Sequence, residues 1–568
     1  MDVGGFQIYY GNPIEAVIYF RDIINAANKT QGACPECGNI NPEQIFSIIE
    51  TRVVNEYGRL TNTRKISPGQ WYQYFKQKIK VPKIDHVQDT LPVTQEIPNW
   101  LSQFNVFVTR DILAKLANKQ YLYINLLAAP LLAFFIAFMV KYYKTGDAAD
   151  TEYSFFNNSN IPVYFFMSVV VALFFGLIMS AEEIFRDRKI LKREEFLNLS
   201  RSSYLISKVF VMFTISAMQT LLFIIVGNSM LEIPLTEMRY WLILFTCSCS
   251  ANMVGLNISA SFDSAVTIYI LIPLLIIPQL LLSGVVISFD KFNPRVGKPV
   301  GVPLMGNLMP SRWAFEAFMV TQFKDNPFQK QFYELDKTIR ESEYKKIYLI
   351  PALQSKLAFV RQHRSEWQNP NAIRTVKALS LLQNGTGAEL ERFNASLFPE
   401  ITRLETGKVD SMVLEKTEVF LSKLRDYYIN QMKKASASRE QLVQSMTRTP
   451  ALQAEFDDHR NRFVNKAVAD AVENISSPDR IIEYDGELVQ KIYPVYSEGR
   501  RPRHLLDFSA NFYEANKQFA GKRINTLPFN LAVIWIMTGL CFIALYLDLL
   551  KRIVKRLEGS RKYRVKDK

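Results

Sequence analysis

Two cysteines near the start of the chain have the spacing of a metal knuckle. Cys34 and Cys37 flank two residues in CPECG, which is half of a zinc ribbon. A structural zinc ion needs four ligands, and no second CxxC follows. Two copies of the chain sharing one ion is one interpretation, and a cytosolic turn with two reduced thiols is the simpler one. We therefore predict no metal site.

No other set of residues has the spacing of a catalytic centre. The sequence lacks the GxxxxGK[ST] loop that cradles nucleotide phosphates, the HExxH helix of zinc proteases and the GxSxG turn of hydrolases. Its four histidines, at 86, 363, 459 and 504, are scattered. We predict that this chain is not itself an enzyme and binds no cofactor.

The most unusual polar stretch is residues 180–208, SAEEIFRDRKILKREEFLNLSRSSYLISK, which lies between two apolar runs. It could be a solvated linker, a lipid headgroup anchor or a docking surface for a protein. A headgroup anchor is mostly basic, whereas this stretch mixes both signs of charge. Mixed charge suits a protein surface with complementary patches, so we favour docking.

The elements around this stretch are apolar runs long enough to cross a bilayer, which takes about 20 residues in a helix. We predict six spans, at 122–142, 162–181, 205–227, 240–260, 264–287 and 528–550. The fourth is the most polar of them. Basic residues crowd the loop at 182–204 and the tail at 551–568, which predicts that both lie in the cytosol. The net charge of +14 thus reflects membrane orientation, and we expect no nucleic-acid partner.

The chain is predicted to be mainly α, with a large extracytoplasmic insertion between the fifth and sixth spans. The insertion, 288–527, holds no cysteine and should have five or six helices at 328–475, with breaks at Asn369-Pro370, Gly385 to Gly387 and Gly407. Asp485-Gly486 predicts a hairpin, and a last helix is expected at about 503–520. The expected parts are a mixed cytosolic segment at 1–96 with a short strand at FQIYY, an amphipathic helix at 97–120 capped by Asn99, spans one to five at 121–287, the insertion, span six at 528–550 and the tail at 551–568.

Polar and aromatic residues within the spans are candidates for a transport pathway. Asn252 and Asn257 lie in the fourth span, where interhelical hydrogen bonding is the plainer role. Phe174 and Phe175 lie on an aromatic surface of the second span. Most such rings face lipid or neighbouring helices, and one or two could line a cavity.

The order of three motifs resembles the membrane half of the White-type G subfamily of ABC transporters, within the ABC-2 exporter class. The motifs are GGFQIYYGNPIEAVIYF with CPECGNINPEQIFSII, then AEEIF…REEF…SRSSYLISK, then LMGNLMPSRWAFEAFMVTQF. The first resembles the end of the family's ATP-binding domain and matches its pattern at Gly4, Gly5, Tyr10, Gly11, Tyr19, Phe20, Cys34, Asn41 and Pro42. The likeness covers about 1–60, 97–325 and 527–557. Residues 328–510 have no counterpart in that pattern.

The resemblance implies a permease that works as a dimer with an ABC ATPase domain, where ATP and Mg²⁺ would bind. It implies that the charged loop forms a coupling helix against that domain, with contacts from Glu182, Glu183, Arg186, Glu194, Glu195 and Tyr204. It places Phe174 and Phe175 at the wall of the transport cavity. The expected location is a membrane, with a bacterial inner membrane suggested and both termini in the cytosol. The alternative function is a non-transporting membrane anchor that presents 328–510 as a binding module.

Overall fold

The computed structural model describes residues 1–25, 43–81, 98–142, 153–194, 197, 199–234, 237–293, 295, 297, 300–369, 371–393, 397–498 and 508–566. Cys34, Cys37, Asn41, Pro42 and Glu195 lie outside these residues. The chain divides into two compact units, Met1–Glu96 and Ile97–Lys568.

In its described residues, the first unit packs three helices and one hairpin around a small core that includes Phe20 and Trp71. Its elements are α1 (Pro13–Ile23), α2 (Glu43–Ile49), β1 (Arg52–Val54), β2 (Leu60–Arg64) and α3 (Pro68–Lys78). The strand expected at FQIYY is wrong, because residues 6–10 pair with no strand in the described part of this unit. Their side chains pack on helices instead, as Phe6 does on Tyr72 and Tyr9 on Tyr19.

All six apolar runs form helices in the second unit. Five are long and apolar enough to cross a membrane: α5 (Lys119–Val140), α6 (Ile161–Ala181), α8 (Arg201–Met230), α9 (Glu237–Ser261) and α19 (Thr526–Tyr546). The sixth, α10 (Ala265–Leu281), is a shorter apolar helix and ends six residues before the expected boundary. Just after it, Gly284 has φ +82, and its α-carbon lies so close to Phe289 that a side chain would overlap the ring.

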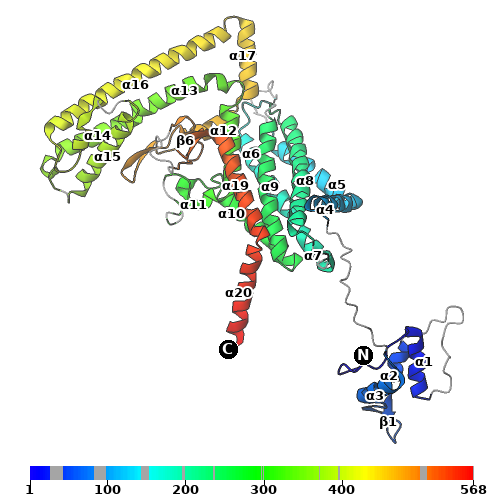
Figure 1. Cartoon of the computed structure of the whole chain (residues 1–568). Helices are drawn as coiled ribbons and strands as arrows, with labels where there is room; N and C mark the ends of the chain where they lie inside the picture. Colours follow the sequence, from blue (N-terminus) through cyan, green and yellow to red (C-terminus); the bar gives the residue numbers. More distant parts are fainter. Residues whose placement is uncertain are drawn as a thin grey trace. The chain divides into compact units, whose positions relative to one another are not determined.

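The apolar helices pack around α9. Its neighbours are α6, α8 and α19, and α5 packs on the other side of α8 (Figure 1). Two further helices join this bundle at one end, α4 (Trp100–Ala117) and α7 (Glu183–Glu194). The predicted cap of α4 is confirmed, because the Asn99 side chain accepts a hydrogen bond from the backbone N–H of Ser102 at 2.8 Å.

Helices α11 (Leu304–Asn307) and α12 (Pro310–Lys324) follow α10, and an arm of helices extends beyond them (Figure 1). The arm contains α13 (Gln329–Tyr344), α14 (Ile350–Gln362), α15 (Ile373–Leu390), α16 (Ser411–Met446), α17 (Pro450–Phe463) and α18 (Lys466–Glu473). The expected break at Gly385 to Gly387 is wrong, since α15 runs through both glycines. Gly385 packs against Leu353 of α14 too closely for a larger residue. The break at Gly407 is confirmed by its φ of +83.

Two hairpins complete the part of the second unit that the structure describes. β3 (Ile481–Tyr484) and β4 (Glu487–Gln490) form the predicted hairpin, and Asp485 and Gly486 both have positive φ, as a tight two-residue turn requires. The helix expected at 503–520 is wrong where the structure describes it. Residues 516–525 form β5 (Asn516–Phe519) and β6 (Lys522–Asn525), which turn at Ala520 and Gly521. The chain then continues through α19 into α20 (Leu549–Lys566).

Candidate functional site

Helix α7 is fixed to the end of α9 by hydrogen bonds that cap both helices. The Ser259 hydroxyl oxygen accepts from the backbone N–H groups of Ile184 and Phe185 at 3.0 and 2.9 Å. In return, the Arg188 guanidinium donates to the carbonyl oxygens of Ser259 and Phe262 at 3.0 and 2.9 Å. These bonds satisfy groups that helix ends leave unpaired, so α7 and α9 are held as one piece.

A buried ion network joins α7 to α4 and α8. Lys208 Nζ of α8 lies 2.5 Å from Asp111 Oδ1, 3.2 Å from Glu183 Oε2 and 2.8 Å from Asp187 Oδ2. Lys115 Nζ of α4 lies 2.8 Å from both Asp111 Oδ2 and Glu183 Oε2. The side chains of Lys208 and Glu183 are only 5% and 2% exposed.

The charges of this network balance. Arg186 Nη2 lies 3.6 Å from Glu183 Oε1, so three cations face three carboxylates. Burial alone would raise the pKa of Asp111, but the charges and hydrogen bonds of Lys208 and Lys115 outweigh it and hold that pKa below its usual value. Buried charges are tolerated only when they are paired in this way.

An apolar cluster surrounds the ion network. Tyr204 of α8 packs edge-to-face on Phe107 of α4, with ring centroids 5.6 Å apart, and its hydroxyl donates to Asp187 Oδ2 at 3.2 Å. Ile184, Leu205, Met253, Leu256 and Leu545 complete the cluster. The junction therefore combines side chains from α4, α7, α8, α9 and α19.

The outer face of α7 is exposed and basic. Arg186, Lys189, Lys192 and Arg193 are exposed there. Two of the remaining acidic residues are engaged within the chain: Glu182 Oε1 accepts from the Tyr269 hydroxyl at 2.5 Å, and Glu194 Oε1 lies 2.8 Å from Arg110 Nη1. The face left for another protein is thus mainly cationic.

Comparison with known proteins bears on this region of the chain. Residues 102–323 match the family model described as ABC-2 type transporter. This segment is an ABC-2 membrane domain. It contains α4 to α12, and therefore the whole ion network.

Two curated relatives are ABC transporters. An ABC transporter ATP-binding/permease protein of Mycobacterium tuberculosis is 30% identical over 163 residues, which are 27% of this chain and 18% of the relative. An ABC transporter G family member of Medicago truncatula is 24% identical over 246 residues, which are 43% of this chain and 28% of the relative. The chain thus spans less than a third of either relative. Together with the apolar helices, the ABC-2 domain indicates an integral membrane protein and the permease part of an ABC exporter.

The structure divides the residues expected at a coupling contact into different groups. Glu183 and Tyr204 are buried at the junction of the helices, whereas Arg186 is half exposed. Glu182 and Glu194 are partly exposed and bound within the chain, and Glu195 is outside the described residues. Sequence reasoning missed Asp111, Lys115 and Lys208 as a group. Two signals were available in the sequence. Lys208 lies inside the third apolar run, and Asp111 and Lys115 are four residues apart on the helix expected before the first run.

The residues expected at a transport cavity make different contacts. Asn252 Nδ2 of α9 donates to Ser216 Oγ of α8 at 2.7 Å, and Asn257 Nδ2 donates to the carbonyl oxygen of Cys541 on α19 at 2.9 Å. Both asparagines therefore join neighbouring helices. Phe174 is exposed on the surface of the chain and Phe175 is half buried.

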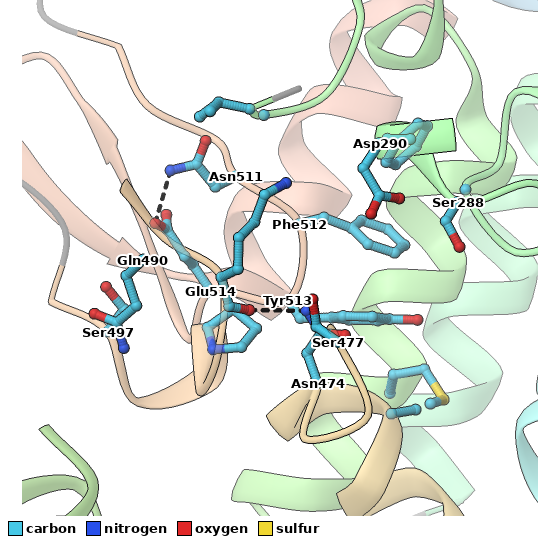
Figure 2. Close-up of a pocket in the computed structure, with 18 of the residues that line it drawn as sticks. Ser288, Asp290, Asn474, Ser477, Gln490, Ser497, Asn511, Phe512, Tyr513 and Glu514 are labelled. Carbon is cyan, nitrogen blue, oxygen red and sulfur yellow. Dashed lines mark hydrogen bonds between the residues drawn. The ribbon is translucent and has the colours of Figure 1, made fainter. Parts of the chain in front are cut away.

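At the opposite end of the ABC-2 domain from α7, a cavity of about 480 Å³ lies at the base of the arm (Figure 2). Pro162 at the start of α6, Gly284 after α10 and Met319 of α12 line one side. The other side comes from the end of α18, from β4 and from residues 511–514. Asn511 Nδ2 donates to Glu514 Oε1 at 2.8 Å across this wall. The cavity lies where the arm joins the apolar bundle.

A second buried ion cluster lies next to this cavity. Glu316 of α12 is fully buried, with Oε1 2.6 Å from Lys517 Nζ and Oε2 3.4 Å from Arg312 Nη1. Glu316 Oε1 also accepts from the backbone N–H of Tyr513 at 2.7 Å, and Oε2 accepts from Asn530 Nδ2 of α19 at 3.0 Å. The cluster fixes β5 and α19 to α12.

Glu473, at the end of α18 beside the cavity, should make stability depend on pH. Burial, assisted by Asp336 and Asp470, raises the pKa of Glu473 from 4.5 to about 7, against the opposing charge of Arg340. Because the folded-state pKa is raised, its stabilising contribution is full below about pH 4.5 and is lost as the pH rises through about 7. The loss amounts to about 3 kcal/mol.

Glu473→Gln removes this titration, so the variant should be more stable than the original chain above pH 7. The measurement is the thermal unfolding midpoint of the purified chain at about pH 5.5 and about pH 8.5, on either side of the raised pKa. Glu415→Gln, at an exposed position of α16, is the matched control. An equal change of midpoint with pH in all three proteins would contradict the prediction.

The described residues contain no group of three or more His, Cys, Asp or Glu side chains that could hold a metal ion. Cys247 and Cys249 are buried as free thiols in α9, and Cys541 is a half-buried free thiol in α19.

Proposed function

We propose that this chain is the permease of an ATP-driven exporter of the ABC-2 class, working as a dimer with an ABC ATPase domain that these 568 residues do not contain. In this proposal ATP and Mg²⁺ bind to that domain, which docks on the exposed face of α7 from the cytosolic side. The inner-membrane location and the cytosolic termini remain part of the proposal, supported by the basic loop and tail.

The observation that carries the proposal is the buried ion network. Helix α7 is capped on α9 and ion-paired with α8 and α4, so a push on α7 is delivered to three helices together. Separating α7 from Lys208 and Lys115 would take both lysine partners from the buried carboxylate of Glu183, which costs several kcal/mol. The junction therefore favours movement of α7 and its attached helices as a rigid body.

The proposal changes which residues are expected to touch the ATPase domain. Glu183 and Tyr204 would act within the junction, and the docking contact would come from the exposed cations of α7. Because the described acidic residues are engaged within the chain, the mixed charge of the sequence does not describe this face. Its exposed cations suit an acidic patch on the partner, which contributes to orientation as well as to affinity.

Reversing two exposed charges on this face should weaken coupling without affecting insertion into the membrane. Lys189 and Arg193 are one helical turn apart, so Lys189→Glu with Arg193→Glu turns attraction into repulsion on one face. We expect a fall of about tenfold in transport-coupled ATP hydrolysis, equivalent to about 1.4 kcal/mol. The measurement is ATP hydrolysis by the chain reconstituted with its ATPase domain in liposomes.

The matched control is Lys555→Glu, an exposed position on α20. Membrane yield and unfolding midpoint should be unchanged in all variants. Normal coupling in the double reversal would refute the docking role of α7.

The cavity at the base of the arm supports the alternative function, a membrane anchor that presents the arm as a binding module. The two functions differ in one measurement. A transporter needs the ATPase partner to be bound, whereas an anchor should show no stable complex with any ABC ATPase when it is purified from its native membrane.

A further inference from the structure

Helices α4 and α5 meet at an elbow at Asn118, and a groove of about 260 Å³ lies inside the angle. Both helices pack on α8, which forms the floor (Figure 1). The lining residues are Ile112, Lys115 and Leu116 of α4, Tyr121, Leu122, Asn125 and Leu126 of α5, and Phe210, Val211, Thr214, Ile215, Met218, Gln219 and Leu222 of α8. The α8 positions recur every three or four residues, so one face of that helix forms the floor.

The groove offers few hydrogen bonds to a polar ligand, because the unpartnered Tyr121 hydroxyl is itself buried and other donors are engaged within the chain. Asn125 Nδ2 donates to the carbonyl oxygen of Tyr121, the Thr214 hydroxyl donates to that of Phe210, and Gln219 Nε2 donates to that of Asn125. The Lys115 amine is bound to Asp111 and Glu183. What remains is an apolar slot, with Leu116, Phe210 and Met218 about half exposed.

We propose that this groove binds one acyl chain of a bilayer phospholipid, whose anionic headgroup lies at the elbow beside Lys119. One wall and the floor of the groove belong to α5 and α8, which are long and apolar enough to cross a membrane, so hydrocarbon is the medium around them. Lys119 is the first residue of α5 and is exposed, which provides a cation where the headgroup region would begin. An apolar tail and an anionic head therefore meet complementary surfaces at one end of α5.

The bound chain would support the ion network. The acyl chain would contact α4 and α8 on the side of the junction that carries Lys115. It would also fill the space between α4 and α5, which are joined mainly through their shared contacts with α8. A filled groove holds α4 against the bundle because it adds dispersion contacts on both walls. This proposal does not depend on the ATPase partner, since lipid binding is measured on the chain by itself.

The test is retention of phospholipid after the purified chain is washed exhaustively in lipid-free detergent, measured by native mass spectrometry. Surrounding lipids exchange quickly, whereas a lipid in the groove should remain, one for each chain. Met218→Trp fills the groove and should lower that occupancy at least tenfold. The matched control is Leu131→Trp, an exposed position of α5 outside the groove, which should retain the lipid as the original chain does.

The headgroup is tested separately by competition between phosphatidylglycerol and phosphatidylcholine. Lys119→Glu leaves the groove intact and should shift the preference at least threefold towards phosphatidylcholine. Equal retention by Met218→Trp and the original chain would overturn the acyl-chain site, and an unchanged preference would overturn the headgroup contact.

Two other occupants would also overturn the proposal. A retained apolar mass that is not a phospholipid would identify the groove as a cargo site. Efficient disulfide formation between two chains by Met218→Cys, in a chain with its five native cysteines replaced by alanine, would identify it as a contact between copies.

Discussion

Lys208→Met should destabilise the chain by about 3–5 kcal/mol, because it leaves three carboxylates, two of them buried, facing only two cations. Among the described residues, Lys208 is the one cation that contacts Asp111, Glu183 and Asp187 together. Methionine has a similar length and keeps the apolar contacts of the lysine stem, so the change in stability reports the loss of the positive charge. The expected result is a large fall in the thermal unfolding midpoint and in the yield of monodisperse protein.

The double variant Lys208→Met with Asp111→Asn separates charge balance from packing. It leaves two cations facing two carboxylates, so it should recover a substantial part of the lost stability. Lys555→Met, at an exposed position on α20, is the control and should change stability by no more than about 0.5 kcal/mol. A double variant that is less stable than the single one would contradict charge balance as the reason.

Glu316→Gln should have an effect of similar size at the opposite end of the bundle. The amide keeps the shape of the side chain and an oxygen for the N–H of Tyr513, but it removes the carboxylate that forms ion pairs with both Arg312 and Lys517. Burial already lowers the pKa of Lys517 while Glu316 opposes that shift. Without Glu316, the buried cations Arg312 and Lys517 would lose their shared ion-pair partner and keep the nearby charge of Glu514, at a cost of about 3–5 kcal/mol.

The loss of stability in Glu316→Gln should appear first where the arm joins α12 and α19. Limited proteolysis should cut residues 508–525 faster in Glu316→Gln than in the original chain, and the unfolding midpoint should fall. Glu415→Gln on α16 is the control, because it removes the same charge from an exposed position. Identical cleavage rates in the two variants would show that the Glu316 cluster does not hold the arm.

Many of the elements were predictable because their causes are local. The six apolar runs became helices, Asn99 capped α4, and Asp485-Gly486 formed a hairpin turn. Hydrophobic length, a side-chain cap and positive φ each depend on a few neighbouring residues. The charged stretch at 182–204 was likewise identifiable, because mixed charge between apolar runs is visible in the sequence.

Local signals failed where distant partners decided the conformation. Residues 516–525 have a composition that a helix accepts, yet Lys517 pairs with Glu316, which lies 201 residues away, and the segment forms a hairpin. Gly385 and Gly387 suggested a helix end, but α15 continues because Leu353 of α14 packs against Gly385. Tertiary contacts override weak propensities in both cases.

The sequence by itself determined that charged residues separate the second and third apolar runs and that both signs of charge are present. Only the tertiary structure decided which of those charges face outward. Glu183 is buried because α4 brings Lys115 within 2.8 Å and α8 brings Lys208 within 3.2 Å, across separations of 68 and 25 residues. A carboxylate can be buried only where cations meet it, and the crossing of α4, α7 and α8 creates that meeting point.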